Sequence, residues 1–206
     1  MRRASRNRAE LLMKAAEVVA ERGFENTRFT DVAGRTGASI STLQYLFGNR
    51  EDLVVQALRA RTAHLLAEAR LAAEAIPDPI VRLRWVAGHL AATDGSPEAA
   101  RAEWMLWVEY WRTALRDDEL AVESIDTYEG WAGLVRDAIQ AAVDAGALPA
   151  PADIDAVAQG ACALADGLGI QIALGRPGMT WERAAGITRG WLATTLSCPP
   201  LADTHS

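Results

Sequence analysis

The chain is 206 residues long and half of its residues are apolar, so it can bury a sizeable core as one large domain or as a small domain joined to a medium one. It contains no run of about 18 uncharged apolar residues and begins with a charged segment, which argues against a membrane span or a secretory signal and favours a cytoplasmic protein without a membrane partner. The net charge is −6, but residues 1–50 carry nine Lys and Arg against five Asp and Glu, whereas residues 51–206 carry twelve against twenty-two.

Apolar side chains recur at helical spacing over residues 6–22, and Gly23 follows them as a C-terminal cap. A second, short helix is expected to run to residue 35, with Thr27 as its N-cap. Both helices lie in the basic part of the chain, which is the charge pattern expected of an end that meets DNA.

A third helix is expected after the turn at Gly37, with Ser39 as its N-cap. Leu43 and Phe47 are four residues apart and therefore share the face that packs inward. A helix, a Gly-containing turn and a second helix with a Ser cap form the helix-turn-helix pattern, whose second helix enters the major groove of DNA. The pattern therefore predicts a three-helix DNA-binding domain.

The remaining side chains of the third helix have the chemistry of DNA contacts. Gln pairs bidentately with adenine, Ser and Thr bond base edges or phosphates, a Tyr hydroxyl reaches phosphate, and Ile contacts a thymine methyl. Asn and Arg at the start of the next helix suit a phosphate. On spacing alone, a solvated helical corner without a DNA role is the alternative. The residues predicted to bind double-stranded operator DNA are Arg28, Ser39, Ile40, Ser41, Thr42, Gln44, Tyr45, Asn49 and Arg50.

Beyond residue 50 the chain keeps a helical pattern, and no segment has the alternation of a strand. Proline-containing breaks and periodic apolar residues predict helices over residues 51–75, 80–92, 98–115, 119–146, 153–174 and 181–196. The expected fold is all-α with about nine helices. We expect a helix-turn-helix DNA-binding domain over residues 1–50 and a second, larger helical domain over residues 51–206.

Three tryptophans mark the helix predicted over residues 98–115. Trp104, Trp107 and Trp111 lie at i, i+3 and i+7 and so form one stripe, which either belongs to the core or lines an apolar cavity. Carboxylates beside this stripe suit a cationic ligand, although pairing with Arg or exposure to solvent is the alternative. The residues assigned to a candidate ligand pocket are His89, Glu103, Trp104, Trp107, Tyr110 and Trp111.

The last two predicted helices each have a face of small residues, which permits close helix approach, with apolar neighbours that supply area to bury. This pattern predicts a four-helix bundle between two copies of the chain, and packing within one chain is the alternative. The residues assigned to the homodimer interface are Ala156, Gly160, Ala163, Leu164, Gly167, Leu168, Ile187 and Trp191.

No pattern of an enzyme, a cofactor site or a metal site is found. The chain has three His, no nucleophile elbow, no phosphate-cradling Gly loop and no HExxH sequence. Cys162 and Cys198 are far apart in apolar contexts and are expected to be small buried side chains rather than metal ligands or a disulfide. We therefore expect no catalytic residue, no metal and no cofactor.

The segment "FTDVAGRTGASISTLQYLFGNREDLV" resembles the DNA-binding domain of the TetR family of bacterial transcriptional regulators. The likeness covers about 45 residues, from Leu11 to Leu53. The segments "WMLWVEYWRTALRDDEL" and "AQGACALADGLGIQIALG" resemble the BetI-type subgroup more loosely. Departures from the family pattern occur at Ile40, Gln44, Leu46 and Arg50, so the operator sequence of a relative does not carry over.

The resemblance implies a ligand-responsive transcriptional regulator, most simply a repressor that binds a palindromic operator as a homodimer and leaves it when an unidentified small-molecule effector binds. It also implies that residues 51–206 form the ligand-binding and dimerisation domain. A shift of this kind requires that the effector bind the two conformations with different affinities. Activation instead of repression and ligand-independent DNA binding are the alternatives, and enzymatic activity is not expected.

Overall fold

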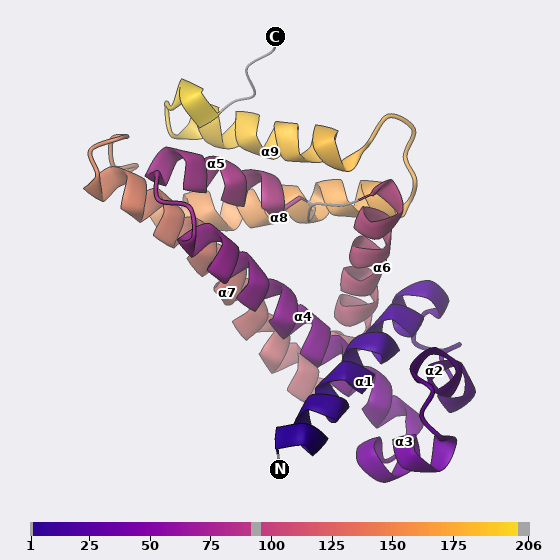
Figure 1. Cartoon of the computed structure of the whole chain (residues 1–206). Coiled ribbons are helices and arrows are strands. Elements are labelled where there is room, and N and C mark those ends of the chain that lie inside the picture. Colours follow the sequence, from indigo (N-terminus) through magenta and orange to yellow (C-terminus); the bar gives the residue numbers. More distant parts are fainter. Residues whose placement is uncertain (1, 92–95, 202–206) are drawn as a thin grey trace. The chain divides into compact units, whose positions relative to one another are not determined.

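The computed structural model describes residues 2–91 and 96–201, and these form nine α-helices and one short 3-10 helix with no strand among them (Figure 1). The all-α prediction is confirmed. The helices are α1 (Arg2–Arg22), α2 (Phe29–Thr36), α3 (Ile40–Phe47), α4 (Arg50–Glu74), α5 (Pro79–His89), α6 (Pro97–Ala114), α7 (Asp118–Asp144), α8 (Ile154–Ala173), α9 (Trp181–Thr195) and η1 (Pro199–Leu201).

The chain divides into two compact units. The first runs through Leu65 and includes Met105–Ile125, and the second comprises Leu66–Trp104 and the chain from Asp126 onward. The start of α4 and parts of α6 and α7 therefore join the first three helices in one unit. The functional boundary expected at residue 50 is not the boundary between compact units, and it stays a prediction about function.

In the first unit, a small core holds the three N-terminal helices together. Val19 of α1, Val32 of α2 and Leu43 of α3 are fully buried, and α2 contacts both α1 and α3. Helices of eight residues such as α2 and α3 are marginal in isolation, so their stability comes from this packing.

The predicted cap of α2 is wrong by one residue. Arg28 is the N-cap, and its backbone N–H donates to the Asp31 carboxylate at 2.9 Å. Thr27 is instead fully buried, and its hydroxyl donates to the Gly23 carbonyl at 2.8 Å. A buried hydroxyl needs a partner, and the end of α1 supplies one here.

In the second unit, α9 packs against both α5 and α8 (Figure 1). Leu83, Val86, Ala161 and Leu192 belong to its apolar core. Asp78 caps α5 by accepting from two backbone N–H groups, so this helix begins at Pro79 and ends at His89, and residue 92 of the predicted helix lies outside the described residues. The length and mean hydropathy of α8 match those of a membrane span, a test that core helices of globular proteins also pass.

Candidate nucleic-acid interface and effector region

The turn between α2 and α3 has the local geometry that the sequence predicts. Gly37 adopts φ 75°, and its N–H donates to the Ala33 carbonyl at 2.8 Å, which closes α2. A left-handed backbone of this kind favours glycine. Ser39 caps α3, since its hydroxyl oxygen accepts from the Thr42 N–H at 3.1 Å. The predicted Ser cap is confirmed.

Helix α3 has one buried face and one exposed face. Leu43 and Phe47 are buried as predicted. Ser41, Gln44 and Tyr45 are exposed, and Tyr45 has an exposed fraction of 88%. Three side chains able to bond base edges or phosphates therefore lie together on the exposed surface of the helix. None of them belongs to the core.

Hydroxyl groups at the start of α3 bond to one another. The Ser39 hydroxyl lies 2.9 Å from the Ser41 hydroxyl and 2.8 Å from that of Thr42, so three hydroxyl groups form a local network around the cap. Ile40 is 40% exposed, which leaves its side chain available for an apolar contact. The exposure of these residues is consistent with contact to DNA, and the contact itself stays a prediction.

At the start of α4, the two predicted phosphate contacts have other roles in the structure. Asn49 Oδ1 accepts from the Asp52 N–H at 2.8 Å and so caps the helix. Arg50 Nη1 donates to the Phe24 carbonyl at 2.6 Å, and its Nη2 lies 3.0 Å from the Glu51 carboxylate. Arg28, by contrast, is exposed.

The six predicted pocket residues divide between the two units. Trp107, Tyr110 and Trp111 lie in the first unit, and the Trp107 ring is 5.9 Å from each of the other two ring centroids. Trp107 and Tyr110 are buried. His89, Glu103 and Trp104 fall in the second unit. Both a core position and a cavity lining bury the ring, so the pocket role of Trp107 stays a prediction.

Trp104 occupies a slot over α8 within the second unit. Its Nε1–H donates to the Ala91 carbonyl at 2.7 Å. A Cβ added to Gly169 would lie 2.1 Å from the Trp104 ring, so glycine is required there for the indole to lie against the backbone of α8. Both findings show that Trp104 packs into the second unit, with its polar nitrogen satisfied.

A set of aromatic rings in the second unit was only partly anticipated from the sequence. His89 on α5 stacks on Trp85 with ring centroids 4.3 Å apart, and Trp131 on α7 lies 6.2 Å from His89. Tyr128 precedes Trp131 by one helical turn, so both project from the same side of α7. Sequence reasoning singled out His89 but missed the other three residues, although the spacing of Tyr128 and Trp131 was a usable signal.

Tyr128 is hydrogen-bonded to a carboxylate of altered acidity, Asp166. Burial disfavours the charged form and raises the pKa of Asp166 on α8 to about 6, while a hydrogen bond with Tyr128 acts in the opposite direction. Burial and the nearby Asp166 charge raise the pKa of Tyr128, so its hydroxyl stays a donor. Burial, and then the Asp166 charge, raise the pKa of the Cys162 thiol, which keeps it protonated and unreactive.

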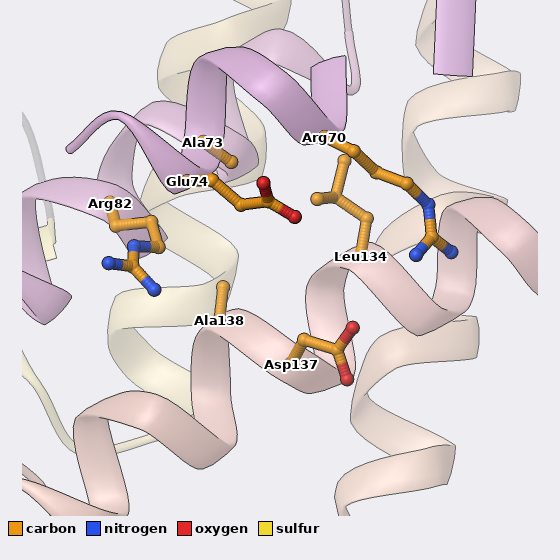
Figure 2. A pocket seen from close by; sticks show the side chains of 7 residues that line it. All are labelled: Arg70, Ala73, Glu74, Arg82, Leu134, Asp137 and Ala138. Atoms are coloured by element: carbon orange, nitrogen blue, oxygen red, sulfur yellow. The ribbon is translucent and has the colours of Figure 1, made fainter. Parts of the chain in front are cut away.

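A small hollow in the second unit has different chemistry. It is lined by charged residues of both signs and by three apolar residues (Figure 2). Both of its guanidinium groups are engaged, because Arg82 donates to the Ile76 carbonyl at 2.8 and 2.9 Å and Arg70 donates to the Gly130 carbonyl at 3.0 Å. Its volume of about 80 Å³ holds a few water molecules, far below the usual size of a ligand pocket.

The residues predicted at the dimer interface fall into two groups. Ala156, Ala163 and Gly167 of α8 and Ile187 of α9 are exposed. Leu164 is half-buried, and Leu168 is buried within the chain, where it serves the chain's own core. Gly160 makes room for the Trp191 ring, since a Cβ there would lie 2.9 Å from the indole. Ile170 on α8 and Leu174, the C-cap residue of α8, extend this exposed face, with exposed fractions of 41% and 78%.

Two family models of bacterial transcriptional regulators together match most of the chain. The family model described as bacterial regulatory proteins, tetR family, matches residues 11–57, and the model described as BetI-type transcriptional repressor, C-terminal, matches residues 82–197. The HTH-type transcriptional regulator BetI of Burkholderia thailandensis is 29% identical over 173 residues, which cover 81% of this chain and 82% of the relative.

Solved structures have the same fold. A transcriptional regulator from Saccharomonospora viridis, crystallised in complex with choline, matches with a TM-score of 0.79 and 26% identity over 91% of this chain and 96% of that one. A TetR-family regulator from Rhodococcus sp. matches with a TM-score of 0.74 and 24% identity over 93% of this chain and 99% of that one.

Proposed function

The chain belongs to the TetR family of bacterial transcriptional regulators, and on this basis we propose that it binds a palindromic operator as a homodimer and releases it when a small cationic effector binds the second unit. A regulator that binds operator DNA in this way acts in the cytoplasm. The observation that carries the DNA-binding part is the surface of α3, where a Ser-capped helix buries Leu43 and Phe47 and exposes Ser41, Gln44 and Tyr45.

The chemistry of this surface supports direct reading of bases. Gln44 has both a donor and an acceptor, which match the N6 and N7 positions of adenine in the major groove. Ser41 and Tyr45 lie beside it and supply hydroxyl groups for phosphate or base contacts. Ile40 supplies the apolar contact that a thymine methyl takes.

A homodimer through α8 and α9 supports binding to a palindrome. The exposed side chains of Ile170, Leu174 and Ile187 supply apolar area, and the small exposed residues Ala163 and Gly167 let a partner helix approach closely. A two-fold axis repeats the reading helix, and half-sites then lie about one DNA turn apart, roughly 34–36 Å.

For the effector, a cation suits the aromatic residues and the carboxylate of the second unit. Trp85, His89 and Trp131 present stacked rings, and Tyr128, one helical turn before Trp131 on α7, is hydrogen-bonded to Asp166. Aromatic faces and a carboxylate are the groups that hold quaternary ammonium ions in proteins. The choline bound by the structural relative from Saccharomonospora viridis belongs to this chemical class.

The experiment that tests the proposal is selection of bound sequences from a random duplex pool with the purified chain, followed by titration of the selected duplex with and without choline. A palindromic consensus whose binding weakens as choline rises supports the whole proposal. A palindrome unaffected by choline supports operator reading and removes this effector class, which leaves the ligand-independent alternative. Absence of any enriched sequence contradicts operator reading by the free chain.

The pH dependence of choline binding provides an independent check. A cation binds the ionised Asp166, and burial raises the pKa of this carboxyl to about 6. Affinity for choline should therefore rise as the pH increases through this value and level off above it. Calorimetry between pH 5 and 8 should also detect proton release on binding near pH 6.

A further inference from the structure

Charged side chains of α4 and α6 hold the segment between α1 and α2 within the first unit. The Phe24 N–H donates to Glu109 Oε2 on α6 at 3.0 Å, and the Phe24 carbonyl accepts from Arg50 Nη1 on α4 at 2.6 Å. These partners are 85 and 26 residues away along the chain. Both backbone polar groups of one loop residue are thus satisfied by ionised groups, which make stronger hydrogen bonds than neutral ones.

The Phe24 ring makes two further contacts with the same side chains. The guanidinium carbon of Arg50 lies 5.2 Å from the ring centroid and that of Arg112 lies 5.6 Å from it, within the range of cation–π attraction. Arg112 also pairs with Glu109 at 3.1 Å, and the Glu109 side chain is only 14% exposed. We call Phe24, Arg50, Glu109 and Arg112 the Phe24 clamp.

The Phe24 clamp lies in the segment that leads into α2 and α3, the helices proposed to bind DNA. Helices α2 and α3 are eight residues each, so their orientation depends on tertiary contacts. Gly23 ends α1 with φ 77°, and Thr27, four residues later, donates to its carbonyl just before α2 begins. Fixing Phe24 between these two residues therefore fixes the path of the chain into α2.

We propose that Glu109 and Arg50 are positioning residues for operator binding, which act through Phe24 to hold α2 and α3 in the orientation that DNA requires. The inference rests on the proposed function, in which α3 reads the operator. It gives Arg50 a different role from the phosphate contact predicted from the sequence. It also connects the part of α6 that lies in the first unit to α2 and α3 through Phe24.

The sign of the charge at Glu109 makes the inference testable. Removing a carboxylate from a DNA-binding protein lowers its repulsion from phosphates and should strengthen binding. A positioning role predicts the opposite, because Glu109→Ala releases the Phe24 N–H. Glu25→Ala is the matched control, since Glu25 also pairs with Arg112, at 3.5 Å, but its side chain is 70% exposed and the Phe24 N–H donates to Glu109 instead.

The experiment measures fluorescence anisotropy of the full-length chain with the duplex selected by the wild type and with a scrambled duplex, well below each variant's Tm. We expect Glu109→Ala to weaken operator binding about tenfold and to leave binding to the scrambled duplex unchanged or slightly stronger, since loss of the carboxylate lowers repulsion from phosphates. Glu109→Gln should retain most affinity, because its amide oxygen still accepts from Phe24. Glu25→Ala should bind as well as the wild type or more tightly. Equal operator affinity of Glu109→Ala and the wild type overturns the role of Glu109.

For Arg50, the dependence of affinity on salt separates positioning from phosphate contact. We expect Arg50→Ala to weaken operator binding without changing the slope of log Kd against log salt. A slope smaller by about 0.9 would mean that Arg50 neutralises one phosphate and would overturn its positioning role. Because Arg50→Ala breaks the clamp independently of Glu109, it keeps the proposal testable if Glu109→Ala does not fold.

Hydrogen exchange at the Phe24 amide tests the clamp without DNA. This amide should exchange faster in Glu109→Ala than in the wild type and in Glu25→Ala. If the wild type selects no duplex, the proposed function fails, and unchanged exchange at Phe24 would separately overturn the clamp. If the wild type binds its operator and Glu109→Ala binds it equally well, the positioning role fails and the proposed function stands.

Discussion

Replacement of Asp166 by Asn should remove a pH dependence of stability that burial creates. The pKa of Asp166 rises from 3.8 to about 6 because its carboxyl is buried. The folded state therefore keeps a proton that the unfolded state loses between these two values. Unfolding releases this proton, so the stability of the wild type should fall as the pH rises from about 4 to 6.

The magnitude follows from the size of the shift. A difference of about two pKa units corresponds to at most about 3 kcal/mol at pH 7, less whatever remaining solvent access screens. The amide introduced by Asp166→Asn would carry no charge, and its carbonyl oxygen would still accept a hydrogen bond from Tyr128. For a chain of this length, the gain should raise Tm at pH 7 by at most about 10 °C relative to the wild type.

The assay is thermal or urea unfolding between pH 3.5 and 8, monitored by circular dichroism. Asp137→Asn on the exposed side of α7 is a suitable control, since it removes a carboxylate of the hollow in Figure 2. The pH dependence of the unfolding free energy should differ between the two variants only above about pH 4, where ionisation of Asp166 begins to destabilise the folded state. Equal pH dependence of Asp166→Asn and the wild type would refute the reasoning.

Three further substitutions test separate parts of the molecule. Gln44→Ala should relax preference at particular base pairs by about 1–3 kcal/mol in the duplex selection, whereas uniform weakening on all duplexes would make Gln44 a backbone contact. Gly169→Ala should lower the free energy of unfolding by about 1–3 kcal/mol, because its Cβ would overlap the Trp104 ring, and a crystal structure with the indole unmoved would contradict this. Leu174→Glu on the exposed face of α8 should convert a dimer to a monomer in analytical ultracentrifugation without lowering Tm of the isolated chain, and an unchanged mass would remove this face from the interface.

The sequence was informative about features that depend on neighbours along the chain. The Ser39 cap, the Gly37 turn and the inward face of Leu43 and Phe47 follow from backbone hydrogen bonding and helical period, and the structure confirms each of them. The Thr27 cap failed because a buried hydroxyl found the Gly23 carbonyl, one turn back, as its partner. A preference for capping positions does not reveal such a competing partner.

The effector region could be predicted only in part. Trp104 was recognised from its spacing, but its slot depends on Gly169, which lies 65 residues later on α8. Asp166 was not singled out, because a lone acid in an apolar helix gains its altered pKa only from the residues that bury it. Its partner Tyr128 is on another helix, and no local pattern relates the two.

The sequence by itself determined the helical class, the helix-turn-helix and the basic end that contains it, since helical period, caps and charge are local properties of the chain. Only the tertiary structure decided that Arg50 contacts Phe24, that Glu109 contacts the segment between α1 and α2, and that Tyr128 and Asp166 are partners. These contacts join residues far apart in sequence. They form only when helix packing offsets the entropy of bringing the segments together, and helical period alone carries no record of which helices meet.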